Sequence, residues 1–182
     1  MQADIAKILF PREQIAQRVD DLAGEIVRAY DLETNADLVL VSILSGALIF
    51  TADLMRRLPQ PMRIGLITVS AYRGATTESR GARVLRELDV DVTDRHVLLV
   101  DDILDTGGTL RLVRERLLLA RPRSLRTCVL LRKPSKAPID LPVDFVGFDI
   151  DNEFVVGYGL DYNDLYRNLP DIGVLKKELY SC

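Results

Sequence analysis

Residues 97–109 read VLLVDDILDTGGT, and this stretch decides how the whole chain is interpreted. Four apolar residues predict a buried β-strand that ends in the carboxylates of Asp101 and Asp102. A third carboxylate, Asp105, precedes a turn of small residues, after which apolar residues recur at helical spacing. A glycine-rich turn that leads into a helix favours a bound phosphate, because it offers free backbone N–H groups and the positive end of the helix dipole. Carboxylates instead bind Mg²⁺ or accept hydrogen bonds from sugar hydroxyls. The stretch therefore predicts a site for a phosphorylated sugar with a metal ion beside it.

Three other interpretations of this stretch carry less weight. An isolated Asp-Asp pair at the end of a strand is most often a solvated turn, but here a small-residue turn and a helix follow directly. A Walker loop needs a lysine directly after its last glycine, and no lysine follows Gly108. The phosphate-accepting aspartate of a response-regulator domain would follow the first strand, whereas this acidic stretch lies past the middle of the chain.

The composition limits the classes of protein that fit. The chain has 182 residues, of which 48% are hydrophobic, so it suits one domain with a substantial core. Its net charge of −3 and the lack of a basic run disfavour a general nucleic-acid binder. No apolar run approaches the roughly 18 residues of a membrane span, and the N-terminus has no signal-peptide pattern, so we expect a cytoplasmic protein with no membrane partner. Neither cysteine has the spacing of a metal ligand, and the only histidine, His96, reads as a polar residue at a strand edge.

The rest of the chain alternates predicted strands and helices, as in an α/β fold. Apolar residues between Ile15 and Ile26 fall on one face of a helix. The run Leu38–Leu44 predicts a buried strand of a parallel sheet, and small residues then lead into a helix from Leu48 to Leu58. Such a turn at the carboxyl end of a buried strand is where open α/β sheets bind ligands. Further strands are predicted at residues 62–71, 84–88, 125–131 and 144–148.

Two segments far apart in the sequence resemble one known family. Residues 97–109 closely resemble the phosphoribosyl-diphosphate (PRPP) motif of type I phosphoribosyltransferases, most of all that of the hypoxanthine-guanine branch. The segment Phe154–Asn163, which by itself reads as a strand, a glycine-rich turn and an acid, resembles the purine-binding hood of that branch. The resemblance covers the chain from about Leu38 to Arg167.

This resemblance implies the type I phosphoribosyltransferase fold, an α/β fold whose central, mostly parallel sheet is flanked by helices, with a small hood for the purine. A single domain would span residues 1–182. Its hood would be built from the N-terminal segment and residues of about 133–182, and a mobile loop would occupy about 72–84.

The resemblance also implies how the ribose and its 5′-phosphate would be held. Asp101 and Asp102 would contact the ribose hydroxyls and, directly or through water, a Mg²⁺ ion. The turn from Thr106 to Thr109 would bind the 5′-phosphate. Asp105 would be the general base that takes a proton from the purine.

A second loop of the resembled family binds diphosphate, and here it comprises Leu44, Ser45 and Gly46. The family often has a cis peptide at the position of the Leu44–Ser45 bond. It usually has Lys or Arg in place of Ser45, so this chain lacks one positive side chain near the diphosphate. Tyr72 would lie at the base of the mobile loop, which closes over the reacting atoms, and Ala71 stands where the family has a serine.

The base would be held by the second half of the chain. Lys133 falls on the lysine that donates to the purine O6, which would select hypoxanthine or guanine over adenine. Phe154 would stack on the base, and backbone groups of Val155 would read its edge. Asp161 would hold a second Mg²⁺ through water, and Arg167 would contact diphosphate. Without the resemblance, Lys133 would read as a solvated strand-end residue and Phe154 as a core residue.

The predicted function is purine salvage: Mg²⁺-dependent transfer of 5-phosphoribosyl from PRPP to hypoxanthine and/or guanine, giving IMP or GMP and diphosphate. We expect a homodimer or homotetramer without nucleic acid. Two alternatives remain: a xanthine-preferring transferase, and a nucleotide-sensing RNA-binding regulator of the same fold, which would need a basic surface. Asp105 is the predicted catalytic residue, and the predicted metal ligands are Asp101, Asp102 and Asp161. The predicted substrate-binding residues are Leu44, Ser45, Gly46, Tyr72, Asp101, Asp102, Ile103, Asp105, Thr106, Gly107, Gly108, Thr109, Lys133, Phe154, Val155, Asp161 and Arg167.

Overall fold

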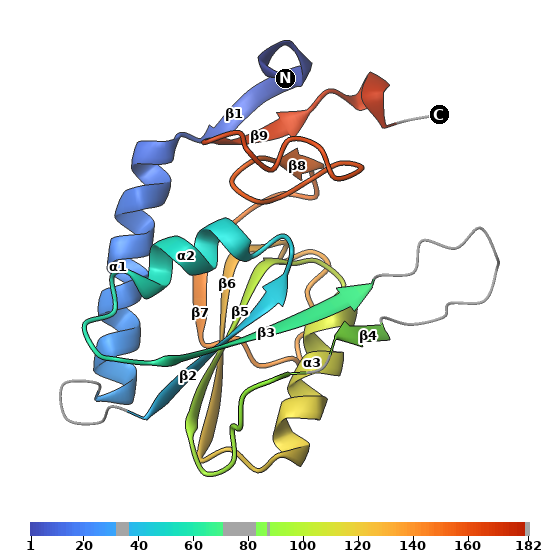
Figure 1. Ribbon diagram of the computed structural model, residues 1–182. Coiled ribbons are helices and arrows are strands. Elements are labelled where there is room, and N and C mark those ends of the chain that lie inside the picture. The colour runs from blue at the N-terminus through green and yellow to red at the C-terminus, as the bar shows by residue number, and fades with distance from the viewer. Residues whose placement is uncertain (32–36, 71–82, 87, 181–182) are drawn as a thin grey trace.

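A six-stranded sheet forms the body of the protein (Figure 1). This computed structural model describes residues 1–31, 37–70, 83–86 and 88–180. The strand order is β4-β3-β2-β5-β6-β7, and all neighbours are parallel except β3 and β4. The strands are β2 (Leu38–Leu44), β3 (Arg63–Ser70), β4 (Arg83–Arg86), β5 (His96–Leu104), β6 (Ser124–Arg132) and β7 (Phe145–Asp149). The predicted central, mostly parallel sheet is confirmed.

Helices cover both faces of this sheet, which explains why its inner strands are apolar throughout. Helices α1 (Arg12–Tyr30) and α2 (Leu48–Met55) pack on one face, against the side chains of Leu38 and Leu40. Helix α3 (Gly108–Leu119) packs on the other face, against Val39 and Val41. Because successive residues of a strand point to opposite faces, each inner strand must supply apolar side chains to two cores.

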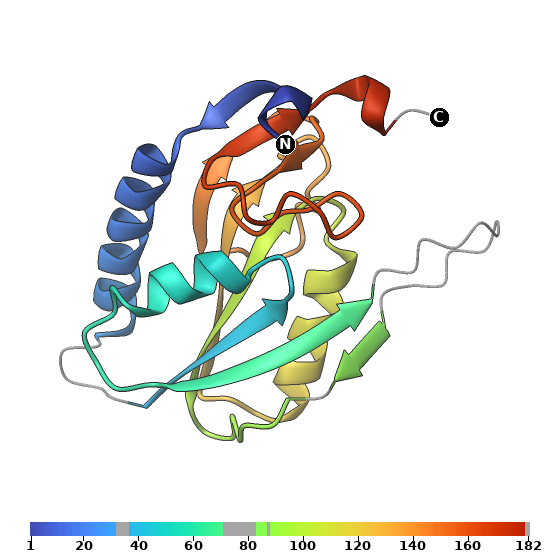
Figure 2. The ribbon, with the colours of Figure 1, turned by 45° about the horizontal axis from the view of Figure 1, so that its top comes forward.

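A second, smaller sheet lies beyond the carboxyl ends of the central strands (Figures 1 and 2). It has the order β1-β9-β8 and joins the two ends of the chain. Its strands are β1 (Ile5–Phe10), β8 (Val155–Val156) and β9 (Ile172–Leu175), and short 3₁₀ turns occupy Gln2–Asp4 and Lys177–Leu179. We call this sheet, with the loop between β8 and β9, the hood.

The structure corrects several predicted boundaries. Strand β5 continues through Asp101 and Asp102, so these carboxylates lie within the strand and not at its end. Helix α2 ends at Met55, three residues before the predicted end at Leu58. Strand β4 pairs with β3 at the outer edge of the sheet, and the sequence analysis predicted neither β1 nor β9.

None of the helices in the described part of the chain combines the length and the apolar character that a bilayer crossing requires. Tyr72 and Ala71 lie outside the described residues, as does most of the loop predicted at 72–84.

Candidate functional site

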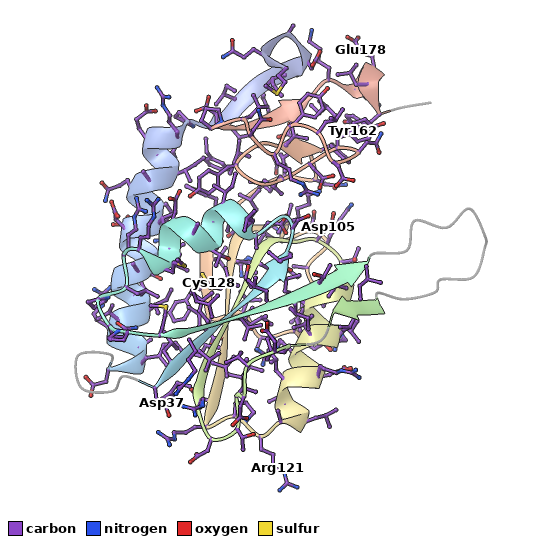
Figure 3. All side chains as sticks on the ribbon, viewed as in Figure 1. Asp37, Asp105, Arg121, Cys128, Tyr162 and Glu178 are labelled. Carbon is purple, nitrogen blue, oxygen red and sulfur yellow. The ribbon has the colours of Figure 1, made fainter. Side chains whose placement is uncertain are left out.

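The candidate site lies where the connections of the central sheet reverse direction. Strand β2 connects through α2 to β3 on one side, whereas β5 connects through α3 to β6 on the other. The carboxyl ends of the neighbouring strands β2 and β5 therefore open a crevice between two diverging loops. Figure 3 shows Asp105 at this end of the sheet, with Tyr162 of the hood beyond it.

The loop after β2 approaches β5 very closely. Its Leu44–Ser45 peptide bond is cis, as the resemblance led us to expect. A Cβ atom on Gly46 would lie 1.8 Å from Asp102 Oδ2, so the carboxylate rests directly on the glycine backbone. On the other side, a Cβ on Gly159 of the hood would lie 2.2 Å from the Gly46 carbonyl oxygen. Gly46 is thus enclosed between β5 and the hood, at a point where only glycines fit.

Arg167 connects this corner to the rest of the hood. Its Nη1 donates a 2.8 Å hydrogen bond to the Gly159 carbonyl. Its Nη2 lies 3.0 Å from Asp161 Oδ1 and 2.9 Å from Asp164 Oδ1. Burial raises the pKa of Asp102, and the charge of the Arg167 guanidinium acts in the opposite direction by a smaller amount. Gly46, Asp102, Asp161 and Arg167, which the sequence placed in separate motifs, therefore form one neighbourhood.

The two adjacent carboxylates of β5 are in an unusual electrostatic environment. Asp101 is only 5% exposed, and its Oδ1 accepts a 3.0 Å hydrogen bond from the Asp102 backbone N–H. Burial, followed by the charge of Asp102, raises the pKa of Asp101 well above its ordinary value. Burial also raises the pKa of Asp102, although the Ile103 N–H donates to its Oδ1 at 2.8 Å. A cation near these oxygens would offset the cost of burying both charges.

The carboxylates suit a Mg²⁺ ion that is shared with substrate. Carboxylate oxygens are hard ligands of the type that Mg²⁺ prefers. Among the described residues, however, no three His, Cys, Asp or Glu side chains gather closely enough to enclose a metal. Mg²⁺ is commonly bound by one or two carboxylates together with substrate phosphates. Asp101 and Asp102 fit that arrangement, and they do not form an all-protein cage with Asp161.

The turn after β5 presents a helix N-terminus with no side-chain cap. Gly107 occupies the N-cap position of α3 with a φ of +76°, and as a glycine it has no side chain that could cap the helix. The first N–H groups of α3 therefore remain available to an anion, as the sequence analysis predicted for the segment from Thr106 to Thr109. A Cβ on Gly107 would lie 3.0 Å or less from Pro138 and Leu141, so the turn is held against the connector that follows β6.

Asp105 begins this turn and is paired with two lysines. Lys133 Nζ donates to Asp105 Oδ2 at 3.1 Å, and Lys136 Nζ lies 3.4 Å from Oδ1. Lys133 is 7% exposed, and its backbone N–H donates to the Leu104 carbonyl at 3.0 Å, which aligns the ends of β5 and β6. The predicted general base and the predicted O6 donor are therefore direct partners.

An aromatic cluster surrounds the predicted stacking residue in the hood. Phe154 stacks on Tyr180, with ring centroids 4.8 Å apart and planes 24° apart. Tyr162 meets Phe154 edge-on, at 5.6 Å and 90°. Val155 lies in β8 opposite Val174 of β9, and the Phe154 carbonyl accepts a hydrogen bond from Leu175. A backbone hydrogen bond and two neighbouring aromatic rings therefore hold Phe154 in place within the hood.

Sequence reasoning missed two residues that the structure brings to this site, Lys136 and Tyr180. Lys136 carried a usable signal, because it follows Lys133 by three residues in a turn. Tyr180 carried none, because its contact with Phe154 depends on how β9 returns beside β8.

Comparisons with known proteins agree with this geometry. The family profile described as "Phosphoribosyl transferase domain" matches residues 6–163. A hypoxanthine-guanine phosphoribosyltransferase from Mycobacterium avium is 44% identical over 180 residues, which are 97% of this chain and 89% of the relative.

Two solved structures are similar over almost the full length. A hypoxanthine phosphoribosyltransferase from Staphylococcus aureus has a TM-score of 0.92 and 39% identity, covering 100% of this chain and 97% of its own. A hypoxanthine phosphoribosyltransferase from Trypanosoma cruzi, solved in complex with the product IMP, has a TM-score of 0.89 and 40% identity, covering 97% of each chain. The chain therefore belongs to the phosphoribosyltransferase family, in its hypoxanthine-guanine branch, and is an enzyme of the transferase class.

Proposed function

We propose that the enzyme transfers 5-phosphoribosyl from PRPP to N9 of a 6-oxopurine, hypoxanthine and/or guanine, and releases diphosphate. The observation that carries this proposal is the pairing of Lys133 with Asp105 at the start of an uncapped helix N-terminus. This pairing brings together a donor for a purine oxygen (Lys133), an acceptor for a purine proton (Asp105) and a binding site for a phosphate (the N-terminus of α3).

The phosphate and the ribose occupy neighbouring positions in this proposal. The N–H groups of the turn from Thr106 to Thr109 bind the 5′-phosphate, and the Thr hydroxyls add donors. Asp101 and Asp102 accept hydrogen bonds from the ribose hydroxyls. Holding the sugar at both places limits the path of C1′ toward the base, which lowers the entropic part of the barrier.

The leaving diphosphate needs positive charge and hydrogen-bond donors. Mg²⁺, when bound, neutralises part of the charge that develops on diphosphate. The backbone N–H groups of the Ser45–Gly46 loop and the guanidinium of Arg167 supply further donors. Ser45 is exposed and carries no charge, so the loop acts through its backbone.

The purine binds beside Lys133 and Asp105, which are hydrogen-bonded to each other in its absence. Lys133 shifts its hydrogen bond from Asp105 to the purine O6, which leaves the Asp105 carboxylate free to accept a proton from the imidazole ring as N9 attacks C1′. A positioned base of this kind is typically worth ~10²–10⁴-fold in rate. An amino group in place of O6, as in adenine, would present hydrogen atoms to the ammonium and would be rejected.

The remaining features of the proposal concern the surroundings of the reaction. Phe154 stacks on the purine, the Val155 backbone reads its edge, and Asp161 would hold a second Mg²⁺ through water. We further propose a single domain in the cytoplasm that assembles as a homodimer or homotetramer.

One assay tests the proposal directly. The purified enzyme is incubated with PRPP and Mg²⁺ and with hypoxanthine, guanine, xanthine or adenine in turn, and diphosphate release is followed. We expect release with hypoxanthine or guanine and none with adenine. Release with xanthine alone would select the xanthine-preferring alternative, and no release with any purine would refute the proposal.

A further inference from the structure

The turn after β6 directs two lysines to one carboxylate. The backbone N–H groups of Lys136 and Ala137 both donate to the Lys133 carbonyl at 2.9 Å, so the chain reverses within a single turn. As a result Lys133 and Lys136 approach opposite oxygens of Asp105.

The two oxygens of Asp105 have different environments. Oδ2 accepts the hydrogen bond of Lys133, whose side chain is only 8% exposed. Oδ1 is buried and has no hydrogen-bond partner among the described residues, although the Lys136 ammonium lies 3.4 Å away. The side chain of Lys136 is 38% exposed, so Lys136 can compensate the charge of Oδ1 while remaining hydrated.

The connector that carries Lys136 is fixed to the phosphate turn at two further points. The side chains of Pro138 and Leu141 pack against Gly107, since a Cβ added there would lie 3.0 Å or less from their atoms. Asp140 accepts two 3.0 Å hydrogen bonds from Arg111 of α3. Lys136 is therefore held on a segment whose position is set relative to the turn that begins at Asp105.

We propose that Lys136 is a positioning residue for Asp105 during transfer. This inference rests on the proposed function, in which Lys133 leaves Asp105 for the purine oxygen. At that moment Oδ2 loses its donor and the carboxylate would be free to rotate. Lys136 lies 3.4 Å from Oδ1 without any help from a purine, so it continues to attract Oδ1 and keeps Oδ2 directed at the base.

The first test compares three variants in steady-state assays with PRPP and hypoxanthine. Lys136→Met should lower kcat by roughly 10-fold, which is less than the ~10²–10⁴-fold expected on loss of a general base. The KM for PRPP should stay unchanged, because Lys136 pairs with Asp105, the proposed base, and not with the residues proposed to bind the 5′-phosphate, the ribose hydroxyls or the diphosphate. Lys136→Arg restores a cation of similar reach and should recover most of kcat. Lys7→Gln is the matched control, since it removes an exposed lysine that is paired with Glu153 on the hood sheet, and its kcat should equal that of wild type.

The second test asks whether Lys136 acts through Asp105. In an Asp105→Asn background, Lys136→Met should cause no further loss of kcat, because the carboxylate it positions is gone. Equal losses in the two backgrounds would overturn the inference, as would a Lys136→Met enzyme with wild-type kcat. If wild-type enzyme releases no diphosphate with any purine, the proposed function fails and this inference fails with it. An active wild type with an insensitive Lys136→Met variant overturns the inference alone.

Discussion

Replacing Gly46 by alanine tests the closest approach in the site. The added methyl would lie 1.8 Å from Asp102 Oδ2 and 2.6 Å from its Cγ, whereas ordinary contact begins near 3.4 Å. The loop cannot retreat, because its carbonyl already lies against Gly159 on the other side. The Asp102 side chain cannot simply rotate either, because its Oδ1 accepts the 2.8 Å hydrogen bond from Ile103 N–H.

The expected loss of stability can be estimated for the two ways in which the clash could be removed. Moving the loop is a case of overpacking, which typically costs about 1–3 kcal/mol. Rotating Asp102 breaks a hydrogen bond to a charged group, which is worth about 1.5–3 kcal/mol. In a chain of this length, 1 kcal/mol lowers the melting temperature by roughly 2–4 °C, so we expect a decrease of about 2–12 °C. A displacement of about 1 Å in a substrate-positioning loop can cost on the order of 100-fold in kcat/KM for PRPP.

Calorimetry and steady-state kinetics on Gly46→Ala measure both effects, with Gly24→Ala as the control. Gly24 lies within α1, and the nearest atom to its added methyl is the end of the Arg28 side chain at 3.4 Å. The same chemical change should there raise the melting temperature by about 1–4 °C, because alanine suits a helix better than glycine by about 0.5–1 kcal/mol. A Gly46→Ala enzyme with the wild-type melting temperature and KM for PRPP would refute the reasoning.

The remaining predictions concern the base and the metal. Asp105→Asn should keep PRPP affinity and lose most of kcat with hypoxanthine; near wild-type kcat at neutral pH would show that Asp105 is not the general base. Lys133→Ala should weaken 6-oxopurine binding, measured by calorimetric titration, with little change in PRPP affinity, whereas an equal loss for both ligands would indicate a structural role. Tyr180→Ala removes the ring behind Phe154 and should raise the KM for hypoxanthine several-fold without changing that for PRPP, since aromatic pairs contribute about 0.5–1.5 kcal/mol. Chelation of divalent cations should stop diphosphate release, and added Mg²⁺ should restore it; turnover in excess chelator would exclude the metal requirement.

The sequence predicted the central part of the fold well, because the signals there are local. Strand β2 has the predicted bounds, Leu38–Leu44, since a strand buried on both faces must be apolar at each position. The face of α1 that carries Ile15 and Ile26 is buried as its spacing predicted. The cis bond before Ser45 followed from the resemblance alone, and no propensity would have indicated it.

The hood strands could not be found in the same way. Strand β1 has three exposed residues in succession among its six, so its sequence shows neither alternation nor a continuous apolar run. Strand β5 was cut short at Asp101, because two carboxylates normally end a strand and only the neighbouring strands explain why this one continues. The pairing of Lys136 with Asp105 likewise depends on β5 and β6 ending side by side.

The small sheet beyond the strand ends has a consequence for biosynthesis. Strand β1 pairs with β9, so that Ile5 lies opposite Leu175 and β1 must wait for β9 to be synthesised before the two can pair. Contacts between such distant segments form slowly, because the entropy cost of closing the long intervening chain comes before the favourable energy of the contacts. The small sheet, to which we assign binding of the nucleobase, is therefore completed only after β9 has been synthesised. A chain cut short before β9 would keep every strand of the central sheet and would lack the complete small sheet.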